Sequence, residues 1–141
     1  MICIIRIRGE IGLRGNAAEA LNRIRLRKKY SCVVLQKPKA EDFGVLKKIK
    51  NFVAYGEISD EVFEKLVEKR GKLIDKNKKT DLKKAAEEII KGKSYQDANI
   101  KPFFRLHPPR GGIDSKIHFG KKKGVLGNHG KEINKLLERM L

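Results

Sequence analysis

The sequence has little of what secreted, metal-binding or membrane-spanning proteins depend on. It contains no tryptophan, only two cysteines and four prolines in 141 residues, and aromatic residues make up 6% of it. Cys3 and Cys32 lie in apolar, strand-like runs without a Cys-x-x-Cys spacing, which predicts buried free thiols rather than a disulfide framework or a zinc site. No apolar run reaches the roughly 18 residues that span a bilayer, and the opening run 1–5 is too short for a secretion signal. We therefore expect an intracellular protein without a membrane partner.

Acidic residues are scarce relative to basic ones. Seventeen Asp and Glu stand against 34 Lys and Arg, which gives a net charge of +17. A compact chain with this charge repels itself, and a polyanionic partner relieves the repulsion. The charge is uneven, because residues 1–58 carry +8 and residues 99–141 carry +7, whereas residues 59–98 carry only +2. The two ends are therefore the candidate nucleic-acid-binding parts.

The first 58 residues predict the order β-α-β-α-β. Three β-branched or apolar runs predict strands, at residues 2–7, 31–36 and 52–55. Apolar residues at helical spacing predict a helix that begins at Asn16 and a second whose buried face includes Phe43. Gly56 is expected to end the third strand. This order favours an α+β fold with a sheet covered by two helices.

The rest of the chain predicts helices on either side of a basic segment. Ser59 and Thr80 are expected to begin two packing helices, and residues 117–119 and 124–127 are candidate short strands that pair. The chain thus divides into a core over residues 1–58, a helical extension over 59–98, a basic Pro/Gly-rich RNA-binding loop region over 99–130, and a C-terminal helix over 131–141 that packs back on the core.

The basic loop region is the most informative part for function. Residues 101–123 contain seven Lys or Arg and one Asp, interleaved with three phenylalanines and several glycines. RNA binding uses cations for phosphates, aromatic or guanidinium planes for unstacked bases, and glycines where the backbone approaches. The alternative is a solvated basic loop whose phenylalanines fill the core. We expect RNA contacts at Arg105, His107, Arg110, Lys116, His118, Lys121, Lys122 and Lys123.

Two further basic groups lie near the N-terminus. The loop punctuated by Gly9, Gly12 and Gly15 lacks the spacing of a nucleotide-binding loop, so it predicts either close approach to an RNA backbone or a plain tight turn. Five cations in seven residues surround the end of the first helix and could bridge phosphates on two sides. The RNA-binding residues expected in these groups are Arg6, Arg8, Arg14, Arg23, Arg25, Arg27, Lys28 and Lys29.

Catalytic and metal-binding patterns are weak. His107, His118 and His129 recur at 11-residue intervals, but no carboxylate or thiolate lies at ligand spacing beside them. No serine sits in a nucleophile-elbow or triad context. We therefore expect no enzyme, no metal, no cofactor and no small-molecule substrate, and an RNA-processing enzyme is the weakest interpretation.

Several motifs resemble the large-subunit ribosomal protein L-thirty family. They are Arg8-Gly9 after the Ile-rich first strand, Leu21-x-x-Ile24-Arg25-Leu26, Gly56-Glu57-Ile58 and, above all, residues 104–112 and 124–128. The resemblance covers essentially the whole chain, and the last two motifs are typical of the long archaeal and eukaryotic form, whereas the short bacterial form resembles residues 1–58 alone. Eukaryotic members usually carry a long basic extension before the first strand, so this chain resembles the archaeal members.

The resemblance implies a ferredoxin-like β-α-β-α-β core with an antiparallel sheet, plus a helical and extended-loop C-terminal portion. It implies a structural constituent of the large ribosomal subunit in the cytoplasm, with ribosomal RNA and neighbouring ribosomal proteins as partners and 5S rRNA as a further candidate. A general nucleic-acid-binding or chromatin-type basic protein is the alternative that charge alone permits. Family members commonly carry His and Asn where this chain has Arg27 and Tyr30, so contacts at that helix end are expected to differ.

Overall fold

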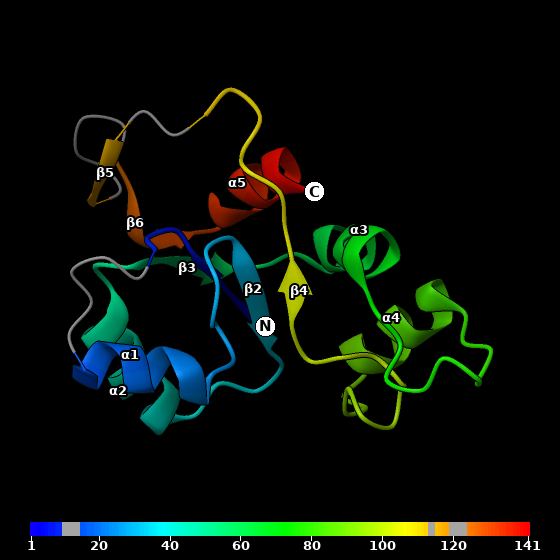
Figure 1. Cartoon of the computed structure of the whole chain (residues 1–141). Coiled ribbons are helices and arrows are strands. Elements are labelled where there is room, and N and C mark those ends of the chain that lie inside the picture. Colours follow the sequence, from blue (N-terminus) through cyan, green and yellow to red (C-terminus); the bar gives the residue numbers. More distant parts are fainter. Residues whose placement is uncertain (10–14, 113–114, 119–123) are drawn as a thin grey trace.

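The predicted β-α-β-α-β core is present in the computed structural model, which describes residues 1–9, 15–112, 115–118 and 124–141 (Figure 1). In this core β1 lies between β2 and β3 and pairs antiparallel with both. The α+β class and the antiparallel core sheet are therefore confirmed. The elements of the core are β1 (Ile2–Arg6), α1 (Gly15–Arg23), β2 (Ser31–Leu35), α2 (Ala40–Ile49) and β3 (Val53–Glu57).

Three later strands extend this sheet at both edges, in the order β4-β2-β1-β3-β6-β5. β4 (Phe104–Arg105) pairs antiparallel with β2, β6 (Gly124–Gly130) pairs parallel with β3, and β5 (Ser115–His118) pairs with β6. The two short strands expected near the C-terminus thus do pair with each other. β4 was not predicted, because two residues show no periodicity.

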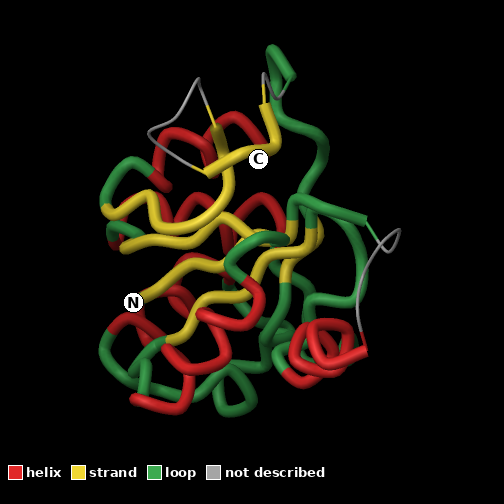
Figure 2. The backbone as a smooth tube through the Cα atoms, turned by 90° about the vertical axis from the view of Figure 1, so that its left-hand side faces the viewer, coloured by secondary structure: helices red, strands yellow, loops and turns green. Residues whose placement is uncertain are grey.

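Helices cover both faces of the sheet. α1 and α2 lie on one side, and α3 (Asp60–Arg70), α4 (Leu82–Ile90) and α5 (Ile133–Met140) lie on the other (Figures 1 and 2). Alternate residues of β1 enter the two cores: Cys3 and Ile5 pack with the second helical layer, and Ile4 packs with residues of α1 and α2. Burial on both faces explains why this strand reads as a continuous apolar run.

Side-chain caps begin the third and fourth helices. The Ser59 hydroxyl accepts a hydrogen bond from the Val62 amide at 3.4 Å, as the sequence predicts. α4 differs by one position, because the Asp81 carboxylate, rather than Thr80, accepts from the Lys83 amide at 3.0 Å. A carboxylate at a helix N-terminus also interacts favourably with the helix dipole.

Two expectations for the first two helices are corrected. α1 begins at Gly15, one residue before the start expected at Asn16. Phe43 is 45% exposed, whereas Leu46 and Ile49 are buried. A spacing of three residues drifts around a helix by about 60° per step, so Phe43 lies well away from the stripe that Ile49 occupies.

Gly56 lies within β3 and does not end it. A β-carbon at this position would lie 2.2 Å from the Gly130 carbonyl oxygen and 2.9 Å from Cβ of Ile133. The end of β6 and the start of α5 therefore approach the β3 backbone more closely than any side chain allows. Gly56 is thus a point of close contact between the core and the C-terminal segment.

Cys3 and Cys32 are buried free thiols, as predicted. They face each other across β1 and β2 with their Sγ atoms 3.3 Å apart. Burial, reinforced by the Cys3 thiol, raises the pKa of the Cys32 thiol well above its usual value. In the described part of the chain, no helix is long and apolar enough to cross a membrane.

The buried His129 is expected to make the stability of the folded protein depend on pH. It is buried in β6 and its Nε2 lies 2.5 Å from the Val125 carbonyl oxygen. Burial lowers the His129 pKa from 6.5, although the Val125 carbonyl and the Glu132 charge act in the opposite direction. Below pH 6.5 the unfolded chain therefore takes up a proton that the folded chain does not. The free energy of unfolding then decreases as the pH is lowered, until the folded-state pKa of His129 is reached.

We expect the free energy of unfolding in denaturant to decrease between about pH 7.5 and about pH 5.5. His129→Gln removes the titrating group and should flatten this decrease, whatever it does to stability at neutral pH. An unchanged slope in the variant would assign the pH dependence to other groups.

Candidate nucleic-acid interface

The cations after α1 are carried by a tight turn that ends the helix. The Leu26 amide donates to the Leu21 carbonyl at 2.9 Å, and the Arg25 amide donates to the Asn22 carbonyl at 3.1 Å. Arg25 has φ +67°, and Leu21 and Leu26 are both fully buried in one cluster. These features define a Schellman motif. The chain therefore leaves the helix axis at Arg25, which is exposed.

Arg25 occupies a backbone conformation that favours glycine, which lowers the free energy of unfolding by about 1 kcal/mol relative to glycine at this position. We expect Arg25→Gly to raise the free energy of unfolding by about that amount, measured in denaturant. The same variant should weaken RNA binding and reduce the salt dependence of affinity by about one phosphate contact. A variant that is more stable and binds equally well would contradict a role of Arg25 in the interface.

Arg6 lies beneath this turn, and its expected contact with RNA stays a prediction. Its side chain points to the same face of β1 as Ile4, toward α1, and the residue is only 2% exposed. The guanidinium donates to the Leu26 carbonyl at 2.8 Å and to the Arg8 carbonyl at 3.0 Å. Arg6 therefore positions the turn and the end of β1 from inside.

Four of the predicted cations line one hollow of about 250 Å³. Three come from the turn after α1, and Arg105 comes from β4, which the pairing of Ser31 with Arg105 brings alongside. Among the described residues, no acidic side chain lines this hollow. Sequence reasoning identified each cation but not their convergence, and it missed Ser31. The residues of this hollow, called the basic hollow below, are Arg25, Arg27, Lys28, Ser31, Phe103 and Arg105.

Other predicted cations lie exposed near it. Arg23 forms an ion pair with Glu19 at 2.8 Å, one turn back on α1, with both side chains mostly in solvent. Lys29 places its Nζ 5.0 Å from the centre of the Tyr30 ring. Such surface contacts contribute little to stability, so both cations can exchange them for phosphates.

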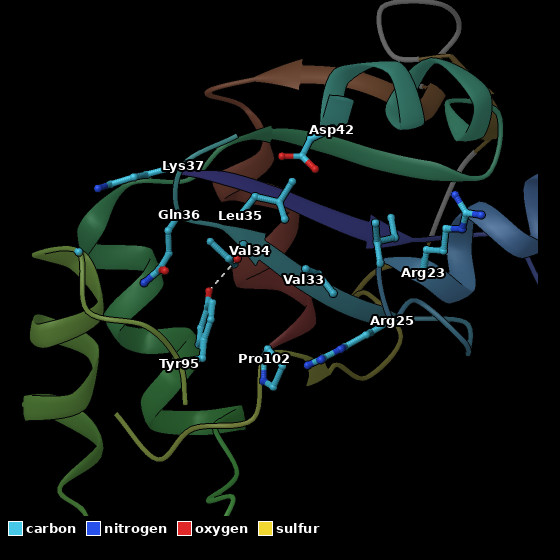
Figure 3. Close-up of a pocket in the computed structure, with 12 residues that line it drawn as sticks. Arg23, Arg25, Val33, Val34, Leu35, Gln36, Lys37, Asp42, Tyr95 and Pro102 are labelled. Atoms are coloured by element: carbon cyan, nitrogen blue, oxygen red, sulfur yellow. Dashed lines mark hydrogen bonds between the residues drawn. The ribbon is translucent and has the colours of Figure 1, made fainter. Parts of the chain in front are cut away.

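A larger hollow of about 560 Å³ lies along β2 and shares Arg25 with the basic hollow (Figure 3). Val33 and Leu35 contribute apolar surface to it, and Asp42 adds a negative charge. The Tyr95 hydroxyl points to β2 and donates to the Val34 carbonyl at 2.7 Å, shown dashed in Figure 3. Three cations, Arg23, Arg25 and Lys37, also line this hollow, but Asp42 offsets one of them, so it suits a polyanion less well than the basic hollow does.

Helix α5 holds the loop at residues 108–112, called the Pro-Pro-Arg-Gly-Gly loop below, which follows β4. The Arg110 amide donates to the Arg139 carbonyl at 3.0 Å, and the Arg139 guanidinium donates back to the carbonyls of Arg110, at 3.0 Å, and Gly112. Gly111 and Gly112 have φ of +82° and +76°, which few other residues adopt. The Arg110 side chain is left exposed on a fixed backbone. Arg139, which sequence reasoning missed, is the positioning residue of this loop.

His107 is half-buried, and its expected contact with RNA stays a prediction. Its Nδ1 lies 2.6 Å from the Pro108 carbonyl oxygen, and its Nε2 contacts the main-chain oxygen of Leu141. Both ring nitrogens are thus engaged within the protein. Among the described residues, no three His, Cys, Asp or Glu side chains could hold a metal ion together.

All the predicted RNA contacts stay predictions, and six of these residues have side chains that the structure does not describe. Lys116 and His118 lie in β5, and the structure does not describe their side chains. The remaining four lie outside the described residues: Arg14, Lys121, Lys122 and Lys123.

Comparison with known proteins gives matches over the whole chain. The family described as ribosomal protein L30p/L7e matches residues 2–53. The large ribosomal subunit protein uL30 of Archaeoglobus fulgidus is 39% identical, with 99% of each chain covered. The proteins of the same name from Methanococcus maripaludis strain C5 and Methanobrevibacter smithii are 38% and 35% identical, with at least 97% of each chain covered. The similarity therefore includes the C-terminal segment that carries β4 and the Pro-Pro-Arg-Gly-Gly loop.

Proposed function

Because this chain belongs to the ribosomal protein L30p/L7e family, we propose that it serves the large ribosomal subunit by binding and stabilising ribosomal RNA. It is a structural constituent of the ribosome in the cytoplasm and not an enzyme. Its partners are ribosomal RNA and neighbouring ribosomal proteins. Nothing favours the alternative of a general or chromatin-type nucleic-acid-binding protein.

The observation that supports this RNA-binding site is the convergence of Arg25, Arg27, Lys28 and Arg105 on one hollow, which no acidic side chain among the described residues lines. Like charges held this close repel one another, so an anionic ligand is needed to offset them. Guanidinium groups also bind phosphate through two parallel hydrogen bonds. The basic hollow is therefore the centre of the proposed interface.

The interface continues along the chain from β4 to α5. Arg105 and Arg110 are separated by only four residues, and this segment runs from β4 past α5 (Figure 1). Contacts at the basic hollow and at Arg110 would therefore fall on neighbouring stretches of RNA backbone. A rigid protein that touches two such stretches fixes their relative position, which is how a structural constituent stabilises folded RNA. We include 5S rRNA as a candidate partner of this surface, which extends from the basic hollow to Arg110.

The test is the salt dependence of binding to fragments of large-subunit ribosomal RNA. Each neutralised phosphate contributes about −0.7 to −0.9 to the slope of log affinity against log salt concentration. An interface of four or more cations should therefore give a total slope of about −3 or steeper. Fluorescence anisotropy between low and moderate salt measures the slope, and 5S rRNA is assayed in parallel. A slope near zero, or failure of the native chain to cosediment with the large subunit in a sucrose gradient, would contradict the proposal.

A further inference from the structure

Ser31 is a mostly buried polar residue that lies at the start of β2. It is 5% exposed, and its main chain pairs with Arg105 of β4. No hydrogen bond among the described residues involves its hydroxyl. The hydroxyl is not one of the fully buried side-chain atoms without a partner, so it is open to the basic hollow, which Ser31 lines. The hydroxyl is therefore available to a ligand that enters the hollow.

Phe103 supplies an aromatic wall of the same hollow. It is half-buried, because it packs against the core cluster of Ile4 and Leu21 while also lining the hollow. The next residue, Phe104, is 1% exposed and packs into the opposite core, edge-on to Tyr95. Phe103, the residue before β4, thus lies on the side of the hollow, as Arg105 does, whereas Phe104 between them faces the opposite core. An aromatic side chain held among cations is the usual platform for an unstacked RNA base.

We propose that the basic hollow binds a single unstacked nucleotide of RNA. The base stacks on Phe103, its polar edge bonds the Ser31 hydroxyl, and the flanking phosphates contact Arg25, Arg27, Lys28 and Arg105. A duplex cannot make these contacts, because its bases are paired and stacked and it presents only its backbone to such a hollow. This inference rests on the proposed function and specifies what part of the RNA the interface receives.

The experiment compares a ten-nucleotide single-stranded RNA of mixed sequence with the same strand in a duplex, using the full-length protein. Phe103→Leu should weaken binding of the single strand by about tenfold and of the duplex by less than about twofold. Ser31→Ala, a smaller change, should weaken binding of the single strand by about threefold. Phe43→Leu is the matched control, because Phe43 is exposed on α2 away from the hollow and should affect neither RNA.

The outcomes separate this inference from the proposed function. If Phe103→Leu and Ser31→Ala change neither affinity, or weaken both RNAs equally, the nucleotide site is wrong, while steep salt-dependent binding by the wild type still upholds the proposed function. If the wild type binds no ribosomal RNA, the proposed function itself fails. An acidic peptide that displaces the single strand as well as unlabelled RNA does would make the hollow a general anion site and overturn the inference.

Discussion

Arg110→Ala is expected to weaken binding to ribosomal RNA by about 1–3 kcal/mol, whereas Lys76→Ala should cost no more than a few tenths. Each substitution removes one positive charge from a chain with 34 Lys and Arg, so bulk charge cannot separate them. Arg110 stands on a backbone that Arg139 holds through hydrogen bonds in both directions. Lys76 lies exposed in the connector between α3 and α4. The guanidinium of Arg110 is therefore preorganised for two parallel bonds to a phosphate, and the ammonium of Lys76 is not.

Both affinities should be measured on one fragment of ribosomal RNA at one salt concentration, after circular dichroism has shown equal folding. Equal losses would mean that the Pro-Pro-Arg-Gly-Gly loop acts only through its charge. Its assignment as a contact site would then be withdrawn.

Gly56→Ala should lower the free energy of unfolding by about 3 kcal/mol. The added methyl group would lie 2.2 Å from the Gly130 carbonyl oxygen, which belongs to backbone, so β6 and the start of α5 would have to move away from β3. Gly44→Ala provides the matched control, because a β-carbon there meets nothing within 4 Å in the interior of α2. That variant should gain roughly 0.5–1 kcal/mol, since alanine favours a helix over glycine.

Denaturant unfolding of the two variants and the wild type measures the difference directly. Similar changes in both variants would show that β6 does not approach β3 as closely as the structure has it.

Local patterns in the sequence predicted the core well. The residues of β1 to β3 are mostly apolar because both faces of the sheet are buried. Ser59 caps α3 through a hydrogen bond within one turn. Such features depend on residues close in sequence, so spacing and residue type reveal them. The predicted cations of the basic hollow were identified in the same way, as charged groups near the ends of elements.

Features that depend on distant parts of the chain could not be read from local patterns. β4 is only two residues long and exists because Phe104 fills the core beside β2. Arg6 belongs to a residue type that is almost always at the surface, and only its position under the turn after α1 shows that it is buried. The hydrogen bonds from Arg139 to the loop at Arg110 likewise require the packing of α5. These long-range arrangements also create the basic hollow.

The hydrogen bond from the Tyr95 hydroxyl to the Val34 carbonyl also affects the tendency of the chain to aggregate before it reaches the ribosome. An open strand edge is a template on which a second copy can add a strand and begin aggregation. β4 covers only the first two residues of β2, and beyond it the phenol occupies an acceptor that an incoming strand would use. The side-chain amide of Gln36, one residue past β2, donates to the Ile89 and Lys93 carbonyls at 3.1 and 2.6 Å and so ties the chain after β2 to the end of α4. The Tyr95 side chain thus occupies a strand-edge acceptor that β4 leaves open, which disfavours edge-to-edge association of newly made copies.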